Sequence, residues 1–439
     1  MTLPSVSLGN RILIVIGTRP EAIKMLPLVR AFREDSRFDC IVVSTGQHQR
    51  LVEEVLGAAG IEPDISLNAV SPGMSLNGLF SAVMTAFERF VRSKYGDHSA
   101  TGFGAPPSGY PAATFVHGDT SSAAATALAS FHLRIPVVHV EAGLRTSDTL
   151  SPFPEELNRQ LISRIAAFHL APTYRNEENL IREGVRHGKI FVTGNTAIDA
   201  LLWASQLSVP YGDPALDNLE TDTGTPVVVV TAHRRENWGA GLERIGTAVA
   251  RLSERYPGVR FIVPLHPNPA VAGVFRGLLE GRSNVDLIAP LAYREFARLL
   301  GRAAFAITDS GGIQEEAPTL GTPVIVVRET TERLEGVEAG TVELVGTDPD
   351  RIVRAAALLL DDPSELARRG ARRNPYGDGN AAQRIVDACA YVAFGDPAPT
   401  PYGSGFNRAE ILRAGGYQED ATAPAPERAS RLVEDMASD

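Results

Sequence analysis

Short apolar runs that alternate with longer helical patterns constrain the fold of this chain more than any other feature. Runs of four to seven apolar residues are typical of strands, and the segments between them have the spacing of amphipathic helices. Strands joined in this way form a parallel sheet with helices on both faces. The first four strand and helix pairs are ILIVIG with Pro20 to Glu34, CIVVSTG with a helix from Gln49, TFVHGD with Ser121 to Leu133, and PVVHVEA with Glu155 to Ala167.

A second series of the same kind begins after Gly194. Its strands are expected at VVVVTAH, RFIVPLH, NVDLIAP, AAFAITD and PVIVVRE, with a helix from Leu242 to Arg255 after the first of them. We therefore predict an α/β protein with two Rossmann-like domains that face each other across a cleft. Open α/β sheets bind ligands at the carboxyl ends of their strands, so functional residues should end strands in both halves.

Length and composition indicate a soluble enzyme of two domains. The chain has 439 residues, of which 44% are hydrophobic and 21% charged, and no apolar run approaches the ~20 residues that span a bilayer. Its start lacks the basic region and cleavage site of a signal peptide, and two cysteines, Cys40 and Cys389, argue against a disulfide framework. We expect a cytoplasmic protein that binds neither membranes nor nucleic acid, since its formal charge is −10.

The stretch TDSGGIQEE, residues 308–316, follows a short apolar strand and leads into a helix. Ser310, Gly311 and Gly312 form a sharp turn, and its backbone N–H groups are expected to face a phosphate. A carboxylate at the helix start, Glu315 or Glu316, would then accept ribose hydroxyls. The alternative is that Asp309 or Ser310 caps the helix and that the acids only favour its N-terminus.

Two cations follow the first strand, in GTRPEAIK. Arg19 and Lys24 are expected to face the cleft and contact an anion, although such residues are usually solvated surface charges. No GxGxxG pattern follows this strand, so nothing here indicates a nicotinamide or flavin cofactor.

Carboxylates end the next two strands and begin the helix after them. Asp119 and Glu141 each end a strand, and capping of the following helix is the alternative role, more plausible for Asp119 than for Glu141. Glu155 and Glu156 begin a helix where acids are favoured in any case, so one of the two is a candidate for a purely structural role. Acids that converge opposite cations suit general acid and base chemistry on a sugar ring.

TAHRREN ends the first strand of the second half with His233, Arg234 and Arg235. A histidine is more often structural than catalytic, but one that ends a strand beside two guanidiniums suits contact with a diphosphate. His266 is expected to pack against its neighbours. The histidines and acids show no HExxH or comparable spacing, so we expect no metal site.

Ten motifs, in their order and spacing, closely resemble the non-hydrolysing UDP-N-acetylglucosamine (UDP-GlcNAc) 2-epimerases over roughly residues 11–390. They are GTRPEAIK, HGDT, HVEAGLR, SPFPEELNR, TGNTAIDAL, TAHRREN, TDSGGIQEEAP, APTLGTPVIV, ETTER and NPYGDG. The resemblance implies a two-domain GT-B fold in which the chain returns to the first domain near its end. The expected domains are residues 1–195 with a return at about 383–395, residues 196–382 for the UDP-binding half, and a Pro-rich, partly disordered tail over 396–439.

The resemblance also implies cofactor-free interconversion of UDP-GlcNAc and UDP-N-acetylmannosamine (UDP-ManNAc) for surface polysaccharide synthesis. In that family the reaction resembles elimination of UDP across C1 and C2 to a 2-acetamidoglucal, followed by addition on the other face. The C2 hydrogen is not next to a carbonyl, so it becomes removable only as the anomeric bond breaks. Cations must therefore hold the leaving diphosphate while carboxylates manage the proton. We also expect a homodimer.

The family's functional residues carry over motif by motif. Its catalytic carboxylates match Asp119, Glu141 and Glu155, and its catalytic histidine matches His233. Its UDP-binding positions match Arg19, Lys24, Phe296, Ser310, Gly311, Gly312, Glu316 and Arg333.

The chain departs from the family at a regulatory motif. Some members bind a second UDP-GlcNAc as an activator through a QHRQ stretch and a later Arg. Gln47 and His48 match as candidate regulatory residues, but Arg50 replaces the second Gln and Gly73 the later Arg. Leu334 stands where the family usually has Pro after its UDP-binding Arg.

Three other functions are the alternatives. A GT-B glycosyltransferase shares the fold and the diphosphate clamp but needs an acceptor site, and a hydrolysing 2-epimerase releases UDP and free ManNAc. A nucleotide-sugar-binding module would not require the four catalytic candidates. The Gly- and Pro-rich loop over 96–113 and the tail, expected to be disordered from Gln418, are assigned no chemistry.

Overall fold

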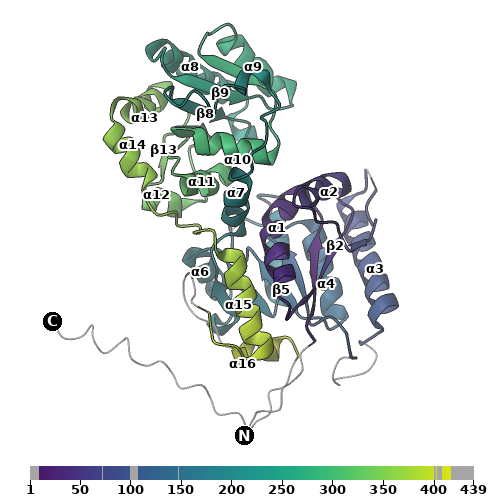
Figure 1. Ribbon diagram of the computed structural model, residues 1–439. Coiled ribbons are helices and arrows are strands. Elements are labelled where there is room, and N and C mark those ends of the chain that lie inside the picture. The colour runs from purple at the N-terminus through teal and green to yellow at the C-terminus, as the bar shows by residue number, and fades with distance from the viewer. Residues whose placement is uncertain are drawn as a thin grey trace, which may run out of the picture.

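Two parallel sheets, each covered by helices, form the two halves of the molecule (Figure 1). The computed structural model describes residues 9–71, 73–98, 107–146, 148–399, 402 and 408–416. The first sheet has seven strands in the order β3-β2-β1-β4-β5-β6-β7, and the second has six in the order β10-β9-β8-β11-β12-β13. All their pairings are parallel. The predicted α/β fold with two Rossmann-like domains is confirmed.

The strands are short and lie close to the predicted apolar runs. In the first sheet they are β1 (Arg11–Ile16), β2 (Asp39–Ser44), β3 (Ile65–Ser66), β4 (Ala113–His117), β5 (Val137–Val140), β6 (Phe168–Ala171) and β7 (Ile190–Val192). In the second they are β8 (Val227–Thr231), β9 (Arg260–Pro264), β10 (Val285–Ile288), β11 (Phe305–Thr308), β12 (Val324–Val326) and β13 (Val342–Leu344).

Helices connect the strands in both halves. Those of the first half are α1 (Arg19–Glu34), α2 (Gln49–Gly57), α3 (Leu76–Tyr95), α4 (Ser121–His132), α5 (Glu155–Ile165), α6 (Tyr174–Arg182), α15 (Ala381–Phe394) and α16 (Arg408–Ala414), with the short η1 (His187–Lys189). Helix α7 (Thr196–Ser205) leads to the second half, which contains η2 (Pro214–Leu216), η3 (Arg235–Asn237), α8 (Ala240–Arg255), α9 (Pro269–Leu279), α10 (Tyr293–Arg302), α11 (Gly311–Glu316), η4 (Ala317–Leu320), α12 (Leu334–Ala339), α13 (Pro349–Asp361) and α14 (Pro363–Gly370).

The central strands bury both of their faces, which is why they read as unbroken apolar runs. In β1, Ile12, Ile14 and Ile16 join the core beneath α1 and α15, whereas Leu13 and Val15 join the core beneath α3 and α4. Strand β8 is divided in the same way between the two large cores of the second half. Each sheet is therefore held from both sides, and its strand ends are fixed relative to one another.

Two chain segments cross between the halves, one before α7 and one before α15. The N–H of Asn195 on the first segment donates to the carbonyl of Tyr376 on the second at 2.7 Å. Asp199 on α7 then accepts hydrogen bonds from the N–H groups of Ala381 and Ala382 at 3.2 and 2.8 Å, so its carboxylate holds the start of α15. Helix α15 packs against α1 and returns the chain to the first half (Figure 1).

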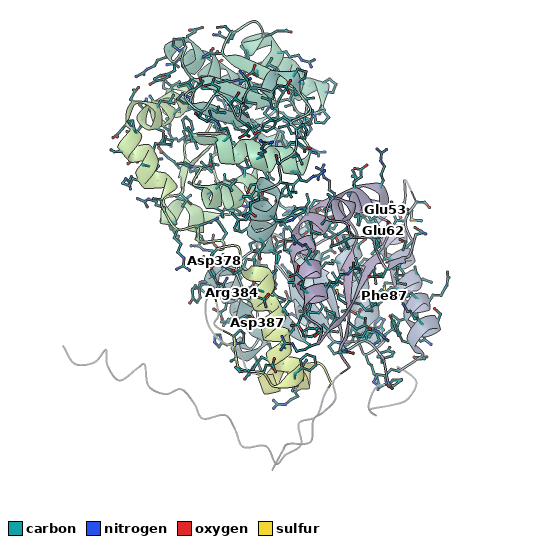
Figure 2. The ribbon with its side chains drawn as sticks, viewed as in Figure 1. Glu53, Glu62, Phe87, Asp378, Arg384 and Asp387 are labelled. Carbon is teal, nitrogen blue, oxygen red and sulfur yellow. The ribbon has the colours of Figure 1, made fainter. Side chains whose placement is uncertain are left out.

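The C-terminal part of the chain adds a surface layer to the first half. Arg384 and Asp378 form a two-bond ion pair beside the second crossing (Figure 2). Beyond α15, Ile411 of α16 is buried against the core beneath α1. The predicted disorder from Gln418 onward and part of the 96–113 loop lie outside the described residues, and the domain boundaries near 195 and 382 stay predictions. No helix in the described part of the chain is long and apolar enough to cross a membrane.

Replacing Asp199 with Ala tests the bond between α7 and α15. Asp199 is 9% exposed, and its loss leaves two buried N–H groups without an acceptor. We expect the free energy of unfolding to fall by about 2 kcal/mol or more, because an unpaired buried donor costs roughly 1–3 kcal/mol. Burial raises the pKa of Asp199 to about 6, so chemical denaturation should be measured at about pH 8, where the carboxylate is ionised.

Asp362→Ala is the matched control for this measurement. Asp362 also accepts from two backbone N–H groups, those of Ser364 and Glu365 at the start of α14, but at a site that is more open to water. Water replaces the carboxylate there, so a smaller loss of stability is expected. Equal losses for the two variants would contradict the role assigned to Asp199.

Candidate active site

The sequence-predicted site residues lie at the carboxyl ends of both sheets or on the helices that follow. Those of the first half are Arg19, Lys24, Asp119, Glu141 and Glu155. Those of the second half are His233, Phe296, Ser310, Gly311, Gly312, Glu316 and Arg333. The charge of Glu315 acts on Lys24, and that of Lys24 acts on Glu316, so the edges of the two sheets adjoin.

Lys24 and Glu141 form an ion pair at the edge of the first sheet. Lys24 Nζ donates to Glu141 Oε1, and His117 Nε2 lies 3.8 Å from Glu141 Oε2. Burial opposes ionisation of Glu141, but the charge and hydrogen bond of Lys24, together with His117 and Arg159, outweigh it and lower the pKa of Glu141 to about 2. Glu141 is therefore ionised at neutral pH. Its backbone φ of 61° lies in the left-handed region, which costs a residue with a Cβ on the order of 1–3 kcal/mol and is maintained here by the surrounding structure.

Asp119 has a different partner and the opposite pKa shift. Burial raises the pKa of Asp119, although Arg159 Nη2 of α5 lies 2.5 Å from its Oδ2 and opposes the shift. The alternative that Asp119 caps α4 is wrong, because Thr120 occupies the N-cap and its side chain accepts from the N–H of Ala123. The carboxylate of Asp119 is thus left for Arg159 and for the space at the strand end.

Glu156 has the structural role that was expected for one of the acids at the start of α5. It is fully buried and accepts hydrogen bonds from the N–H of Thr146 and from the side chains of Arg159 and Gln160. Glu155, the first residue of α5, is only half-buried. Of the two, Glu155 is therefore the candidate for contact with a ligand.

A buried carboxylate, Asp309, positions His233. Asp309 is 0% exposed and accepts hydrogen bonds from the N–H groups of His233 and Arg234 and from Asn237 Nδ2, all at 2.9–3.1 Å. It therefore holds the loop after β8 to the end of β11, and the alternative that it caps α11 is wrong. Burial lowers the pKa of His233, although Asp309 opposes the shift. His266, predicted to pack, stacks its ring on that of His233 with the centroids 5.4 Å apart.

Arg333 lies over the turn that begins α11. A Cβ placed on Gly311 would lie 2.5 Å from Arg333 Cζ, so only glycine allows the guanidinium this position. Arg333 Nε donates to Glu315 Oε1 at 2.7 Å, and its Nη1 donates to Glu332. Ser310 occupies the N-cap of α11, as the capping alternative expected, but its side chain forms no hydrogen bond to the helix. Because α11 has only six residues, the positive charge at this turn comes mainly from Arg333.

Glu316, expected to accept ribose hydroxyls, sits among charges of both signs. Burial raises the pKa of Glu316 to about 8, with Lys24 and Arg333 opposing the shift and Glu315 adding to it. At neutral pH the side chain is therefore mostly protonated, and it can donate one hydrogen bond as well as accept others.

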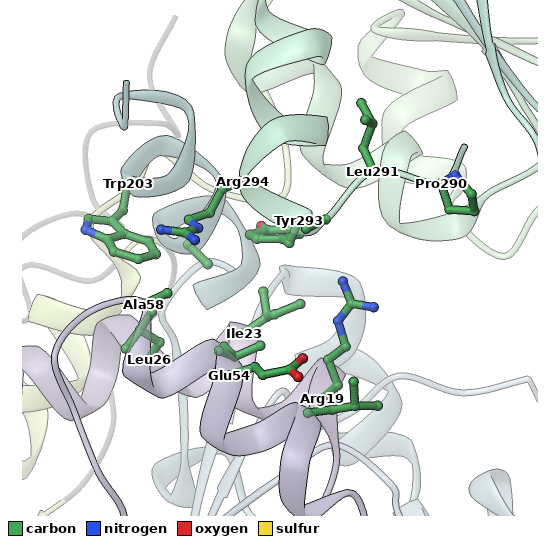
Figure 3. A pocket seen from close by; sticks show the side chains of 14 residues that line it. Arg19, Ile23, Leu26, Glu54, Ala58, Trp203, Pro290, Leu291, Tyr293 and Arg294 are labelled. Carbon is green, nitrogen blue, oxygen red and sulfur yellow. The ribbon is translucent and has the colours of Figure 1, made fainter. Parts of the chain in front are cut away.

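Arg19 lines a cavity of about 550 Å³ between the halves (Figure 3). Residues of α1, α2 and α7 form one part of the wall, and residues 290–294, which lead into α10 and begin it, form the other. Arg19 projects from α1 toward this segment, which includes Leu291 and Tyr293 (Figure 3). Phe296, further along α10, instead packs partly buried against the core of the second half.

Glu21 is a buried residue of the site that the sequence analysis missed. It is 2% exposed and accepts from the N–H groups of Gly17 and Thr18 at 3.0 and 2.6 Å and from Thr120 Oγ1 at 2.8 Å. Burial raises the pKa of Glu21 to about 7. The Thr-x-x-Glu spacing of Thr18 and Glu21, a capping-box pattern, was the available signal. Because Glu21 occupies the N–H groups of this turn, they do not form the phosphate loop found in other Rossmann folds.

The candidate regulatory residues lie at the loop after β2. Gln47 Oε1 accepts from Ser122 Oγ at 2.7 Å, and His48 is exposed at the N-cap of α2. Arg50, which replaces the family's second Gln, pairs with Glu54 at 2.8 Å on the surface of α2. Nothing lies within 4 Å of a Cβ built on Gly73. Of this group, the contacts above tie only Gln47 to the first turn of α4, which follows Asp119 in the chain.

Two further findings concern metals and the loop before α12. Among the described residues no group of three or more His, Cys, Asp or Glu side chains is placed to hold a metal ion. Leu334 is the first residue of α12 and is 42% exposed. A first helical position accepts either proline or leucine, so the substitution leaves Arg333 at the helix start.

Lys24→Met tests the electrostatics of the pair with Glu141. The depressed pKa of Glu141 stabilises the folded protein above the ordinary value of 4.5, and this contribution is lost as the pH falls toward about 2. Without Lys24, burial dominates and the contribution disappears. We expect the melting temperature of Lys24→Met to fall below that of the unsubstituted protein at pH 6 and the difference to shrink as the pH is lowered to 3.

Arg50→Met is the control, because it removes the cation of an ion pair, that of Arg50 with Glu54, at the surface. The side chains of Arg50 and Glu54 are 90% and 53% exposed, and such pairs contribute little to stability. Thermal unfolding of Arg50→Met should match that of the unsubstituted protein at each pH. A Lys24→Met difference that does not depend on pH would contradict the assignment.

Comparisons with known proteins agree with the resemblance read from the motifs. A family model described as UDP-N-acetylglucosamine 2-epimerase matches residues 30–390. The UDP-N-acetylglucosamine 2-epimerase of Escherichia coli (strain K12) is 43% identical over 383 residues, which cover 86% of this chain and 98% of that protein. The crystal structure of UDP-GlcNAc 2-epimerase from Neisseria meningitidis bound to UDP-GlcNAc has a TM-score of 0.74 at 38% identity, with 86% of this chain and 99% of that one covered. The structure of the Methanocaldococcus jannaschii enzyme in complex with UDP-GlcNAc and UDP has a TM-score of 0.66 at 30% identity, with 87% and 99% covered. This chain therefore belongs to the UDP-N-acetylglucosamine 2-epimerase family.

Proposed function

We propose that the protein interconverts UDP-GlcNAc and UDP-ManNAc without net hydrolysis and without a cofactor. The observation that carries the proposal is the pair of carboxylates with opposite pKa shifts, Glu141 and Asp119, beside the cation Lys24 at the edge of the first sheet. Carboxylates whose environments push their pKa values apart are typical of acid and base pairs. The relatives' complexes with UDP-GlcNAc and UDP support these ligands.

The proposed reaction has two steps that mirror each other. The proton leaves C2 while the bond from C1 to the diphosphate oxygen breaks, and UDP takes the bonding electron pair. The remaining sugar is a 2-acetamidoglucal with a double bond between C1 and C2. A proton then adds to C2 on the opposite face as UDP attacks C1, which gives UDP-ManNAc with all atoms retained.

The proposed roles follow from charge. Glu141, ionised at neutral pH, suits proton abstraction or stabilisation of positive charge on the ring, whereas Asp119, with a raised pKa, carries a proton more readily. Glu155 is the third catalytic carboxylate of the proposal. For His233, whose backbone N–H Asp309 holds, the proposed role is contact with the diphosphate or the anomeric oxygen.

UDP binding is proposed for the remaining candidates. Arg19 and Lys24 of the first half and Arg333 of the second are the cations for the diphosphate, with the turn at Ser310, Gly311 and Gly312. Glu316 is proposed for the ribose hydroxyls and Phe296 for the nucleoside side of the site. A ligand contacted from both halves stabilises the state in which the halves are close, and this excludes water from the glycal.

We also propose that the enzyme is a cytoplasmic homodimer that serves surface polysaccharide synthesis. These parts of the proposal rest on the family alone. They are checked by light scattering for the dimer and by loss of the polysaccharide in a deletion strain.

Incubation with UDP-GlcNAc in deuterium oxide tests the reaction. We expect deuterium at C2 of both sugar nucleotides and no accumulation of free UDP, because each proton exchange accompanies re-addition of UDP. Accumulation of UDP with free ManNAc would instead identify a hydrolysing enzyme. UDP release only on addition of an acceptor would identify a glycosyltransferase, and binding without any turnover a binding module.

Substitutions of the acid and base candidates test the site. Asp119→Asn, Glu141→Gln and His233→Ala should each lower kcat by about 10²–10⁴-fold, the contribution typical of positioned acid and base groups. Asp350→Asn and His187→Ala are controls at exposed residues and should keep normal turnover. Near-normal kcat in the Asp119 and Glu141 variants would remove their assignment.

The altered regulatory motif predicts turnover without an activator. With Arg50 and Gly73 in place of the family's Gln and Arg, purified UDP-ManNAc should be converted without added UDP-GlcNAc and without a lag. Progress curves measured with and without a trace of UDP-GlcNAc check this. A lag that the trace abolishes would show that Gln47 and His48 still take part in an activator site.

A further inference from the structure

Glu315 uses its two carboxylate oxygens for two different parts of the molecule. Oε1 accepts from Arg333 Nε at 2.7 Å, and Oε2 accepts from Asn195 Nδ2 at 2.9 Å. The residue is 7% exposed, so these partners take the place of water. A charge-assisted hydrogen bond in such surroundings fixes the orientation of both partners.

Asn195 belongs to the first segment that crosses between the halves, and the second segment also contacts Glu315. Asn374 on that segment donates from Nδ2 to the backbone carbonyl of Glu315 at 2.7 Å. The two segments are joined directly by the hydrogen bond from the N–H of Asn195 to the carbonyl of Tyr376. Glu315 is thus bonded to both connections between the halves.

Arg333, at the other end of this contact, has few alternative positions. Its guanidinium lies where a side chain on Gly311 would otherwise be, and its side chain is 14% exposed. Glu332 takes Nη1 and is itself bonded to Arg328 at 3.0 Å. With its neighbours fixed, the placement of Nε depends on Glu315.

We infer that Glu315 is a positioning residue that couples the crossing segment at Asn195 to Arg333 and so sets the affinity for the diphosphate of the ligand. The inference rests on the proposed function, in which Arg333 contacts UDP. A change in the relative position of the halves moves Asn195 with respect to α11, and the shared carboxylate transmits that change to the guanidinium. Ligand contact at Arg333 and the geometry of the crossing are thereby linked in both directions.

A purely structural role for Asn195 is the competing explanation, and one substitution separates the two. Asn195 also caps α7, because its side-chain oxygen accepts from the N–H of Ala197 at 2.9 Å. Asn195→Ser keeps a favourable N-cap but withdraws the amide donor from Glu315. Its folding should therefore be preserved, and thermal unfolding checks this.

The test is a double-mutant cycle on the affinity for UDP, measured by titration calorimetry. Asn195→Ser should weaken UDP binding about tenfold in the unsubstituted protein, a coupling typical of residues in one hydrogen-bond network. In the Arg333→Lys background the same change should weaken binding less than about twofold, because its route to the ligand is already lost. Glu315→Gln should weaken UDP binding to a similar extent as Arg333→Lys. In the Glu315→Gln background, Asn195→Ser should then have little further effect on the affinity.

Asp348→Ser is the matched control for loss of a side-chain cap contact. Asp348 caps α13, which packs against α8, α14 and β12 of the second half. UDP affinity of this variant should be unchanged. If Asn195→Ser weakened UDP binding equally in the unsubstituted and Arg333→Lys backgrounds, or in neither, the inference would be overturned but the proposed function would not. Failure of the unsubstituted protein to bind UDP would overturn the proposed function and the inference with it.

Discussion

Buried carboxylates that accept backbone N–H groups hold the loops at the strand ends, and the site depends on them. Asp309 fastens the loop after β8 to the end of β11, and Glu21 fastens the turn after β1 to Thr120 beside Asp119. Asp199 does the same for the start of α15. Unpaired N–H groups at such turns are the usual anion sites of α/β proteins, and here carboxylates of the chain occupy them. The positive charge for an anionic ligand must then come from side chains, chiefly Arg19, Lys24 and Arg333.

Lys24 illustrates how one cation influences the protonation of several acids. The charges of Glu141, Glu315 and Asp119 act on Lys24 and, against the effect of burial, raise its pKa. In return Lys24 keeps Glu141 ionised, whereas Glu316, which is buried near the same cation without a bond to it, has a pKa of about 8. Direct contact with Lys24 therefore distinguishes Glu141 from Glu316, since burial acts on both. A diphosphate that drew Lys24 toward itself would change the protonation of these acids together.

Much of the fold could be predicted from the sequence because the central strands bury both faces and the helices between them are regular. The predicted starts at Gln49, Ser121 and Glu155 coincide with the starts of α2, α4 and α5. Strands β3, β6, β7 and β13 were not predicted, because with two to four residues each they are shorter than most of the apolar runs that identified the others. The helix expected to reach Ala167 ends at Ile165, because Ala166 is already extended and leads into β6.

The candidate site was predicted less completely, since its support comes from residues far apart in the chain. The strand-end positions of Asp119, Glu141 and His233 followed from the alternation, but their partners did not. Arg159 is 40 residues from Asp119, and Glu315 is 120 residues from Asn195. Nothing in a local pattern distinguishes a structural from a functional acid in such cases. Of the adjacent acids Glu155 and Glu156, only the contacts in the structure identify Glu156 as the structural one.

Charge alternation then explains how the second half can bury several ions next to one another. Glu236, next to the His233 loop, bonds Arg328 at 2.5 Å, Arg328 bonds Glu332, and Glu332 bonds Arg333. Glu315 and Asn195 complete this series at the crossing between the halves. A buried ion without a partner would cost several kcal/mol, and this cost concerns the most buried members, Arg328, Arg333 and Glu315, whereas Glu236 is exposed. The loop that carries His233, the guanidinium over α11 and the crossing segment are therefore held as one unit, although they come from three distant parts of the sequence.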